Sequence, residues 1–77
     1  MDKYKVAIVD DDEVALENLS FELGKDARFS LKGTARNGKQ GKKLIAKVQP
    51  DLLFLDVELP DMTGMELLQE IRDSVSW

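Results

Sequence analysis

The stretch VAIVDDDE at residues 6–13 decides the fold, because four apolar residues give way abruptly to four acidic ones. Such a short apolar run, rich in β-branched side chains, is typical of a buried strand. Apolar residues then recur at helical spacing from Ala15 to Leu23, and Gly24 is the expected C′ glycine that ends the helix. We therefore predict a strand followed by a helix, whose acidic first turn suits the positive end of the helix dipole.

Two further strand–helix units follow along the chain. Residues 29–34 alternate between apolar and polar, which is typical of a strand with one polar face. The helix expected before Pro50 is weakened by Gly41, which costs about 1 kcal/mol relative to alanine. Residues 52–55, LLFL, have no polar side, and the capping box TGME at residues 63–66 begins a third helix that fades over residues 74–77.

Three alternating strands and helices predict an α/β protein with right-handed crossovers and a parallel sheet. The half-polar second strand belongs at an edge of that sheet. The first and third strands are then neighbours, and the strand order is 2-1-3. We find no linker and no sign of a second domain within the 77 residues.

The composition excludes several classes of function. The chain has no cysteine and no histidine, so it has no disulfide, no thiolate- or histidine-ligated zinc and no histidine catalysis. A net charge of −4 is unfavourable for binding nucleic acid. Without a long apolar run or a signal peptide, we expect a soluble, cytoplasmic chain with no membrane contact.

Acidic residues follow both the first and the third predicted strand. Parallel strands end on the same side of a sheet, so Asp10 and Asp11 should meet Asp56 in the crevice where the chain connections diverge. Two carboxylates about 4 Å apart repel by about 4 kcal/mol at an effective dielectric near 20. A cation, a shared proton or solvent would offset this repulsion. Ligands that are all oxygen favour Mg²⁺, although acidic residues after a strand also serve simply as helix caps, as we expect of Asp12 and Glu13.

A carboxylate beside a bound divalent cation can also act as a nucleophile toward a phosphoryl group. Asp56 is the best candidate, because it stands alone after an apolar strand and the third helix already has its own capping box. Asp10 and Asp11 would then hold the metal.

These motifs together resemble the receiver domain of two-component response regulators. The resemblance lies in residues 6–13, in GTARNG at residues 33–38 and in LFLDVELPDMTG at residues 53–64. It implies the flavodoxin-like (CheY-like) doubly wound sheet, of which residues 1–77 would form the first half. The expected domain is a partial receiver that lacks the last two βα units.

The resemblance also implies roles for individual residues. Asp56 would be the phosphoacceptor, receiving its phosphoryl group from a sensor histidine kinase or a phosphotransfer protein. Asp10 and Asp11 would place Mg²⁺, with Asp11 as a direct ligand, and Glu58 would offer its main-chain carbonyl to the same ion. A chain of this kind is a signalling module of a phosphorelay and not an enzyme.

The sequence departs from the family where the family has a Ser or Thr on the fourth strand and a Lys on the fifth. Neither residue has a counterpart here, so we expect Mg²⁺ binding to survive better than phosphoryl transfer, and switching to be lost. The third strand would expose its edge, which predicts a homo-oligomer, most simply a two-fold dimer. A partly unfolded fragment is the alternative to that dimer.

Two other functions stay open. One is a non-catalytic interaction or dimerisation module built on the half receiver fold. The other is a Mg²⁺-dependent phosphohydrolase, in which Glu58, two residues after the nucleophile, would be the acid/base.

Overall fold

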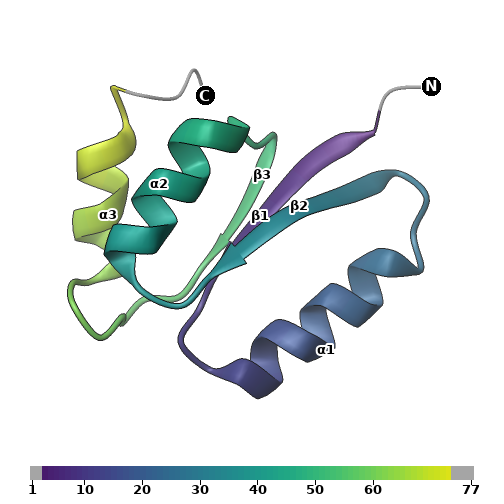
Figure 1. The fold of residues 1–77 in the computed structure, drawn as a ribbon, viewed down its shortest axis with the longest axis horizontal. Coiled ribbons are helices and arrows are strands. Elements are labelled where there is room, and N and C mark those ends of the chain that lie inside the picture. The colour runs from purple at the N-terminus through teal and green to yellow at the C-terminus, as the bar shows by residue number, and fades with distance from the viewer. Residues whose placement is uncertain (1–2, 74–77) are drawn as a thin grey trace.

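The computed structural model describes residues 3–73, so residues 74–77, where the third helix was expected to fade, lie outside it. Strands and helices alternate along the chain (Figure 1), as the sequence predicted. The elements are β1 (Tyr4–Val9), α1 (Glu13–Gly24), β2 (Phe29–Ala35), α2 (Gly38–Val48), β3 (Leu52–Leu55) and α3 (Gly64–Ile71).

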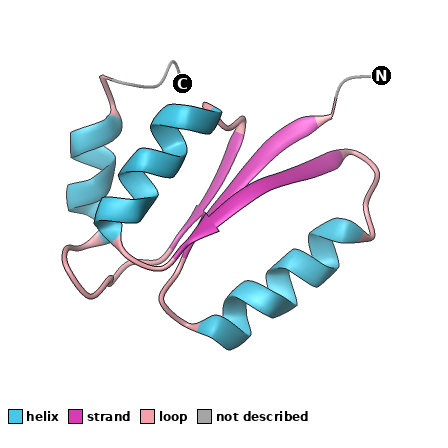
Figure 2. Ribbon diagram, viewed as in Figure 1, coloured by secondary structure: helices cyan, strands magenta, loops and turns pink. Residues whose placement is uncertain are grey.

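The three strands form one parallel sheet in the order β2-β1-β3, which confirms the predicted topology. Helix α1 lies on one face of this sheet, and α2 and α3 lie together on the other (Figures 1 and 2). The central strand β1 is therefore covered on both faces, and residues Val6 to Val9 are all buried. A strand enclosed in this way has no solvent-facing side, which explains its continuous apolar sequence.

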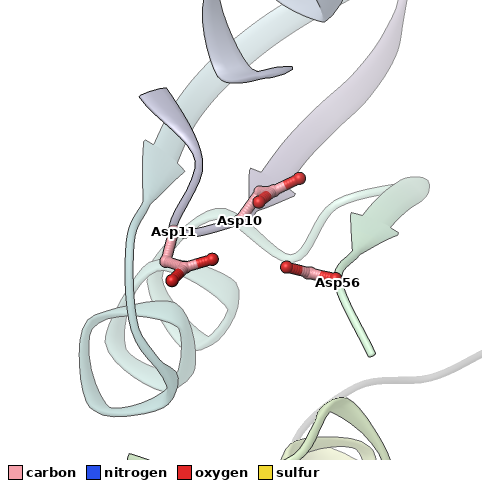
Figure 3. A group of neighbouring side chains, drawn as sticks. All are labelled: Asp10, Asp11 and Asp56. Atoms are coloured by element: carbon pink, nitrogen blue, oxygen red, sulfur yellow. The ribbon is translucent and has the colours of Figure 1, made fainter. Parts of the chain in front are cut away.

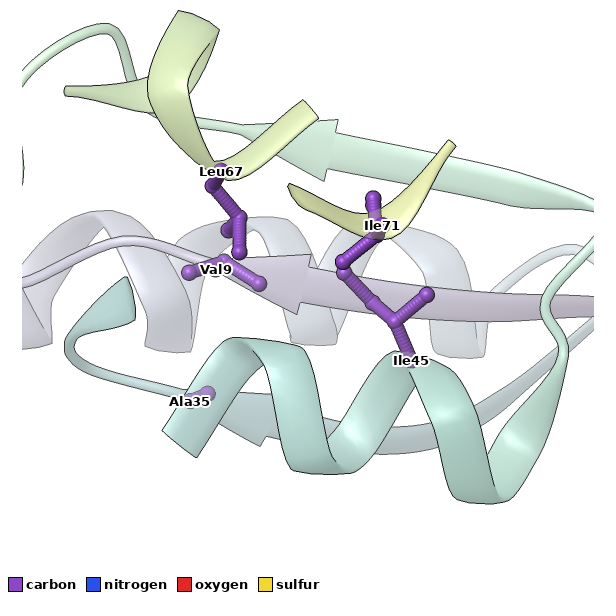
Figure 4. Close-up of a cluster of buried hydrophobic side chains, with 5 residues drawn as sticks. All are labelled: Val9, Ala35, Ile45, Leu67 and Ile71. Atoms are coloured by element: carbon purple, nitrogen blue, oxygen red, sulfur yellow. The ribbon is translucent and has the colours of Figure 1, made fainter. Parts of the chain in front are cut away.

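The core consists of two clusters, one on each face of the sheet. On the α1 face, alternate residues of β1 pack against the helix: the buried members are Val6, Ile8, Leu16 and Leu23. On the opposite face β1 packs against α2 and α3 (Figure 4), and the buried members are Val9, Ala35, Ile45, Leu67 and Ile71. The two helix layers thus fix the position of β1, the strand that leads into the acidic stretch.

Helix α2 forms in full although it contains Gly41. A Cβ atom added to Gly41 would lie 2.9 Å from Cγ1 of Val9 and 3.3 Å from Cδ2 of Leu67. Glycine therefore lets α2 approach β1 closely, and the tertiary packing outweighs its weak helix propensity.

The predicted end of α1 is wrong in one respect. Gly24 is the last residue of the helix itself, and the C-cap is Lys25, whose φ of −80° and ψ of −14° are right-handed. None of the glycines in residues 3–73 has a positive φ. A turn follows this C-cap, because the Asp26 side chain accepts a hydrogen bond of 2.9 Å from the backbone N–H of Arg28.

None of the helices in residues 3–73 combines the length and the apolar character of a membrane span.

Candidate metal centre

Three carboxylates from two strands converge at the carboxyl end of the parallel sheet. One oxygen atom from each of Asp10, Asp11 and Asp56 lies within 4.8 Å of the others. Figure 3 shows the three side chains directed toward a common space. Asp10 and Asp56 are half-buried and Asp11 is exposed. The structure thus brings together the carboxylates that the sequence placed at this end of the sheet.

The sheet itself positions these residues. Val9 of β1 is paired with Leu55 of β3, so the next residue on each strand is an aspartate. The backbone N–H of Asp56 donates to the Val9 carbonyl at 2.9 Å, and that of Asp10 donates to the Ala35 carbonyl at 3.0 Å. Both aspartates therefore sit on backbone that is still hydrogen-bonded to the sheet.

Helix capping explains part of the acidic run. The Asp12 side chain accepts from the backbone N–H groups of Val14 and Ala15, at 3.0 and 3.4 Å, and is the N-cap of α1. An oxygen of Asp10 accepts from the Asp12 N–H at 2.9 Å. Capping therefore uses one oxygen of Asp12 and one oxygen of Asp10. It leaves Asp11 and Asp56 without such a role.

The loop after β3 completes the surroundings of the carboxylates. An open pocket of about 510 Å³ is lined by Asp11, Asp56 and residues 57–60, and so includes Glu58. Glu58 faces Thr63 in an antiparallel bridge. The flanking hydrogen bonds of this bridge use the Val57 carbonyl and the Leu59 N–H, so the Glu58 carbonyl takes no part in them.

Gly64 sets the path of this loop back toward the site. A side chain there would collide with the carbonyl oxygen of Asp56, so only glycine allows the start of α3 to lie so close. The predicted capping box is confirmed: the Thr63 hydroxyl accepts from the Glu66 N–H at 3.1 Å, and the Glu66 carboxylate accepts from the Thr63 N–H at 3.0 Å.

Two residues near the site were not found from the sequence. Arg36 donates from Nη2 to the Asp11 carbonyl at 3.2 Å. Asp61 accepts from the backbone N–H groups of Gly38 and Lys39, at 2.7 and 3.0 Å, and these bonds lower its pKa, the Gly38 bond most. In both pairs the partners are more than twenty residues apart, so no local spacing could have signalled them.

The donor set fits a small hard cation. Mg²⁺ binds oxygen at about 2.0–2.1 Å, so opposite ligands lie about 4 Å apart, and it is usually held by one or two carboxylates with several waters. The three carboxylate oxygens lie within 4.8 Å of one another, which is close enough for all three to face one ion, and the pocket beside them is open to solvent. Without nitrogen or sulfur ligands, the cluster does not favour zinc or copper.

Comparison with known proteins gives a consistent result. Residues 6–76 match the family model of the response regulator receiver domain. The chain is 42% identical over 71 residues to a protein-glutamate methylesterase/protein-glutamine glutaminase of Geobacillus kaustophilus, covering 92% of this chain and 20% of that protein. It is 41% identical over 75 residues to the probable C4-dicarboxylate response regulator DctR of Bacillus subtilis, covering 91% of this chain and 31% of that protein.

The fold comparison agrees with the sequence comparison. The response regulator domain of Thermotoga maritima CheB superposes with a TM-score of 0.90 at 23% identity, covering 95% of this chain and 55% of that domain. The chain spans about a fifth to a third of the length of the two curated relatives.

Proposed function

The chain belongs to the response regulator receiver family, and we propose that it accepts a phosphoryl group on Asp56. In this proposal Asp10, Asp11, Asp56 and the main-chain carbonyl of Glu58 hold a Mg²⁺ ion beside the acceptor. The observation that carries the proposal is the convergence of three carboxylate oxygens within 4.8 Å at the ends of β1 and β3.

The chemistry assigns a different task to each group. An oxygen of Asp56 attacks the phosphorus atom, the new O–P bond forms, and the N–P bond of a phosphohistidine breaks with the imidazole as leaving group. A bound Mg²⁺ would neutralise charge on the phosphoryl oxygens. The main chain of the half-buried Asp56 is hydrogen-bonded to Val9, which supports its role because the backbone that carries the nucleophile is held in place.

The partners follow from the same reaction. The donor is a sensor histidine kinase or a phosphotransfer protein, and we place the exchange in the cytoplasm.

The proposal is tested with acetyl phosphate, Mg²⁺ and intact-mass measurement. We expect a mass increase of one phosphoryl group that disappears in Asp56→Asn and when Mg²⁺ is chelated. Asp51→Asn is the matched control. Asp51 lies directly before β3, at the end of the strand opposite to Asp56, and an asparagine oxygen can still accept from the Lys5 backbone N–H. An adduct that persists in Asp56→Asn, or no adduct while Mg²⁺ binds, contradicts the phosphoacceptor role. Continuous release of phosphate would indicate the hydrolase instead.

A second candidate function, dimerisation, is favoured by the contrast between the two sheet edges. Along β2 the register shifts between Val6 and Ala7, so Lys32 forms a bulge with a charge on the edge. A bulge and a lysine are the usual protection of an edge strand. Along β3 the pairing is regular, the strand Leu52–Leu55 has no charge, and its side chains line an apolar pocket of about 320 Å³.

A second copy of the chain is the partner we propose for this β3 edge, since an edge strand is complementary to itself in antiparallel pairing. Sedimentation tests the idea with two matched substitutions, because Leu52 on β3 and Leu31 on β2 are almost equally exposed, at 37% and 36%. We expect Leu52→Lys to shift a dimer toward monomer and Leu31→Lys to leave it unchanged. A compact wild-type monomer at micromolar concentration rejects the dimer.

A further inference from the structure

The loop that follows the acceptor strand is attached to the start of α2 through one side chain. The Asp61 carboxylate accepts from Gly38 N–H with one oxygen, at 2.7 Å, and from Lys39 N–H with the other, at 3.0 Å. Asn37, the N-cap of α2, accepts from the Gln40 N–H at 2.8 Å. Asp61 therefore supplies two of the three hydrogen bonds that these side chains make to the first turn of α2, across 22 and 23 residues of sequence.

Packing reinforces this attachment. The Met62 side chain lies against Gly38 so closely that a Cβ atom at Gly38 would overlap it. The loop is also closed on itself, since the Leu59 N–H donates to the Met62 carbonyl at 3.0 Å and the Gly64 N–H to the Val57 carbonyl at 2.7 Å. Asp61 lies at the tip of this closed loop, and Glu58 lies within it.

We propose that Asp61 is a positioning residue for the cation site: by anchoring the 57–63 loop to α2, it holds the Glu58 carbonyl beside Asp11 and Asp56. This inference rests on the proposed function, because it assumes that the ion binds there. Asp61 itself does not line the pocket that contains Asp11 and Asp56, does not belong to the three-carboxylate cluster and is not offered as a ligand.

The alternative role of Asp61 is purely local, as a helix cap that stabilises α2 and nothing else. The two roles differ in a measurable way. If the anchor improves Mg²⁺ affinity, then Mg²⁺ must strengthen the anchor by the same factor, because coupling between two sites is reciprocal. A local cap predicts no such linkage.

The experiment combines calorimetric titration of Mg²⁺ with hydrogen exchange on the 77-residue chain. Removing an outer partner of a metal site weakens binding about 10- to 100-fold, and we expect about tenfold weaker Mg²⁺ binding in Asp61→Ala. Asp61→Asn, which keeps an acceptor oxygen, should recover part of that loss. In the wild type, Mg²⁺ should slow exchange of the Gly38 and Lys39 amides.

The matched control is Asp26→Ala. Asp26 also accepts a backbone N–H, that of Arg28, but it lies between α1 and β2 at the opposite end of the sheet. Equal Mg²⁺ affinity in Asp61→Ala and the wild type overturns the inference. Hydrogen exchange of the Gly38 and Lys39 amides that does not depend on Mg²⁺ also overturns it. Both results leave the proposed function standing. Absence of Mg²⁺ binding in the wild type rejects both. If Asp61→Ala does not fold, Asp61→Asn and the wild-type exchange data decide.

Discussion

The backbone N–H of Asp56 lies 2.9 Å from the carbonyl oxygen of Val9, so β3 remains hydrogen-bonded to β1 as far as the residue before Asp10. This bond extends the pairing of β1 with β3, which places the carboxylates of two distant sequence motifs at the carboxyl end of the sheet. It also forces like charges together, since one oxygen from each of Asp10, Asp11 and Asp56 falls within 4.8 Å of the others. Crowding of this kind is stabilised by a cation.

Neutralising one carboxylate of the Asp10, Asp11 and Asp56 cluster should therefore raise the stability of the fold without metal and lower it with metal. In a chelator, Asp11→Asn should unfold at higher urea than the wild type, because one of three repelling charges is gone. In Mg²⁺ it should lose the metal-dependent gain, which for the wild type is about 2.7 kcal/mol at a concentration one hundred times the dissociation constant. Urea unfolding followed by circular dichroism measures both effects.

Asp51→Asn provides the control for that experiment, because it removes the same charge at the opposite end of β3. The Asp51→Asn variant should keep the full Mg²⁺-dependent gain in the free energy of unfolding. If Asp11→Asn and Asp51→Asn respond to Mg²⁺ alike, the ion is not held by Asp11.

Two glycine substitutions should change stability in opposite directions. Gly41→Ala places a methyl group 2.9 Å from Val9 Cγ1 in the core, and overpacking of this kind costs about 1–3 kcal/mol. Gly24→Ala, at the exposed end of α1, meets no atom within 4 Å, and should stabilise the chain by about 0.4–1 kcal/mol. Thermal unfolding distinguishes them, and a stabilising Gly41→Ala would mean that α2 does not lie this close to β1.

Acid should weaken the turn after α1. The Arg28 side chain, and then the Arg28 backbone N–H, lower the pKa of Asp26 from 3.8 to about 2. Because the folded state favours the carboxylate, the stabilisation is complete above about pH 5 and is lost as the pH falls toward 2. The difference in urea midpoint between the wild type and Asp26→Asn should therefore shrink over that range. A difference that stays constant down to pH 2 contradicts the assignment.

Part of the fold could be predicted from the sequence because the polarity of β1 and β2 indicates their places in the sheet, whereas β3 is fully apolar although none of its residues is buried. The continuous apolar run of β1 marked the central strand, and the alternation in β2 marked an edge. The convergence of Asp10, Asp11 and Asp56 then followed from topology alone, since parallel strands end on one side.

What could not be predicted depends on tertiary contacts. From the sequence alone, Gly41 only predicts a less stable helix. Its role in close packing appears once its distance to Val9 is known. The roles of Asp61 and Arg36 depend on backbone groups more than twenty residues away, which the fold brings within hydrogen-bonding distance. The end of α1 was mispredicted because a turn at Asp26 replaced the expected glycine conformation.

The central claim is that one hard ion is held jointly by the ends of β1 and β3. The most direct test is a Mg²⁺ titration of the ¹⁵N-labelled chain followed by amide chemical shifts. We predict that the amides of Asp11, Asp56 and Glu58 shift together with a single apparent dissociation constant. Shifts at only one of the two strand ends, or different constants for the two, would contradict a shared site.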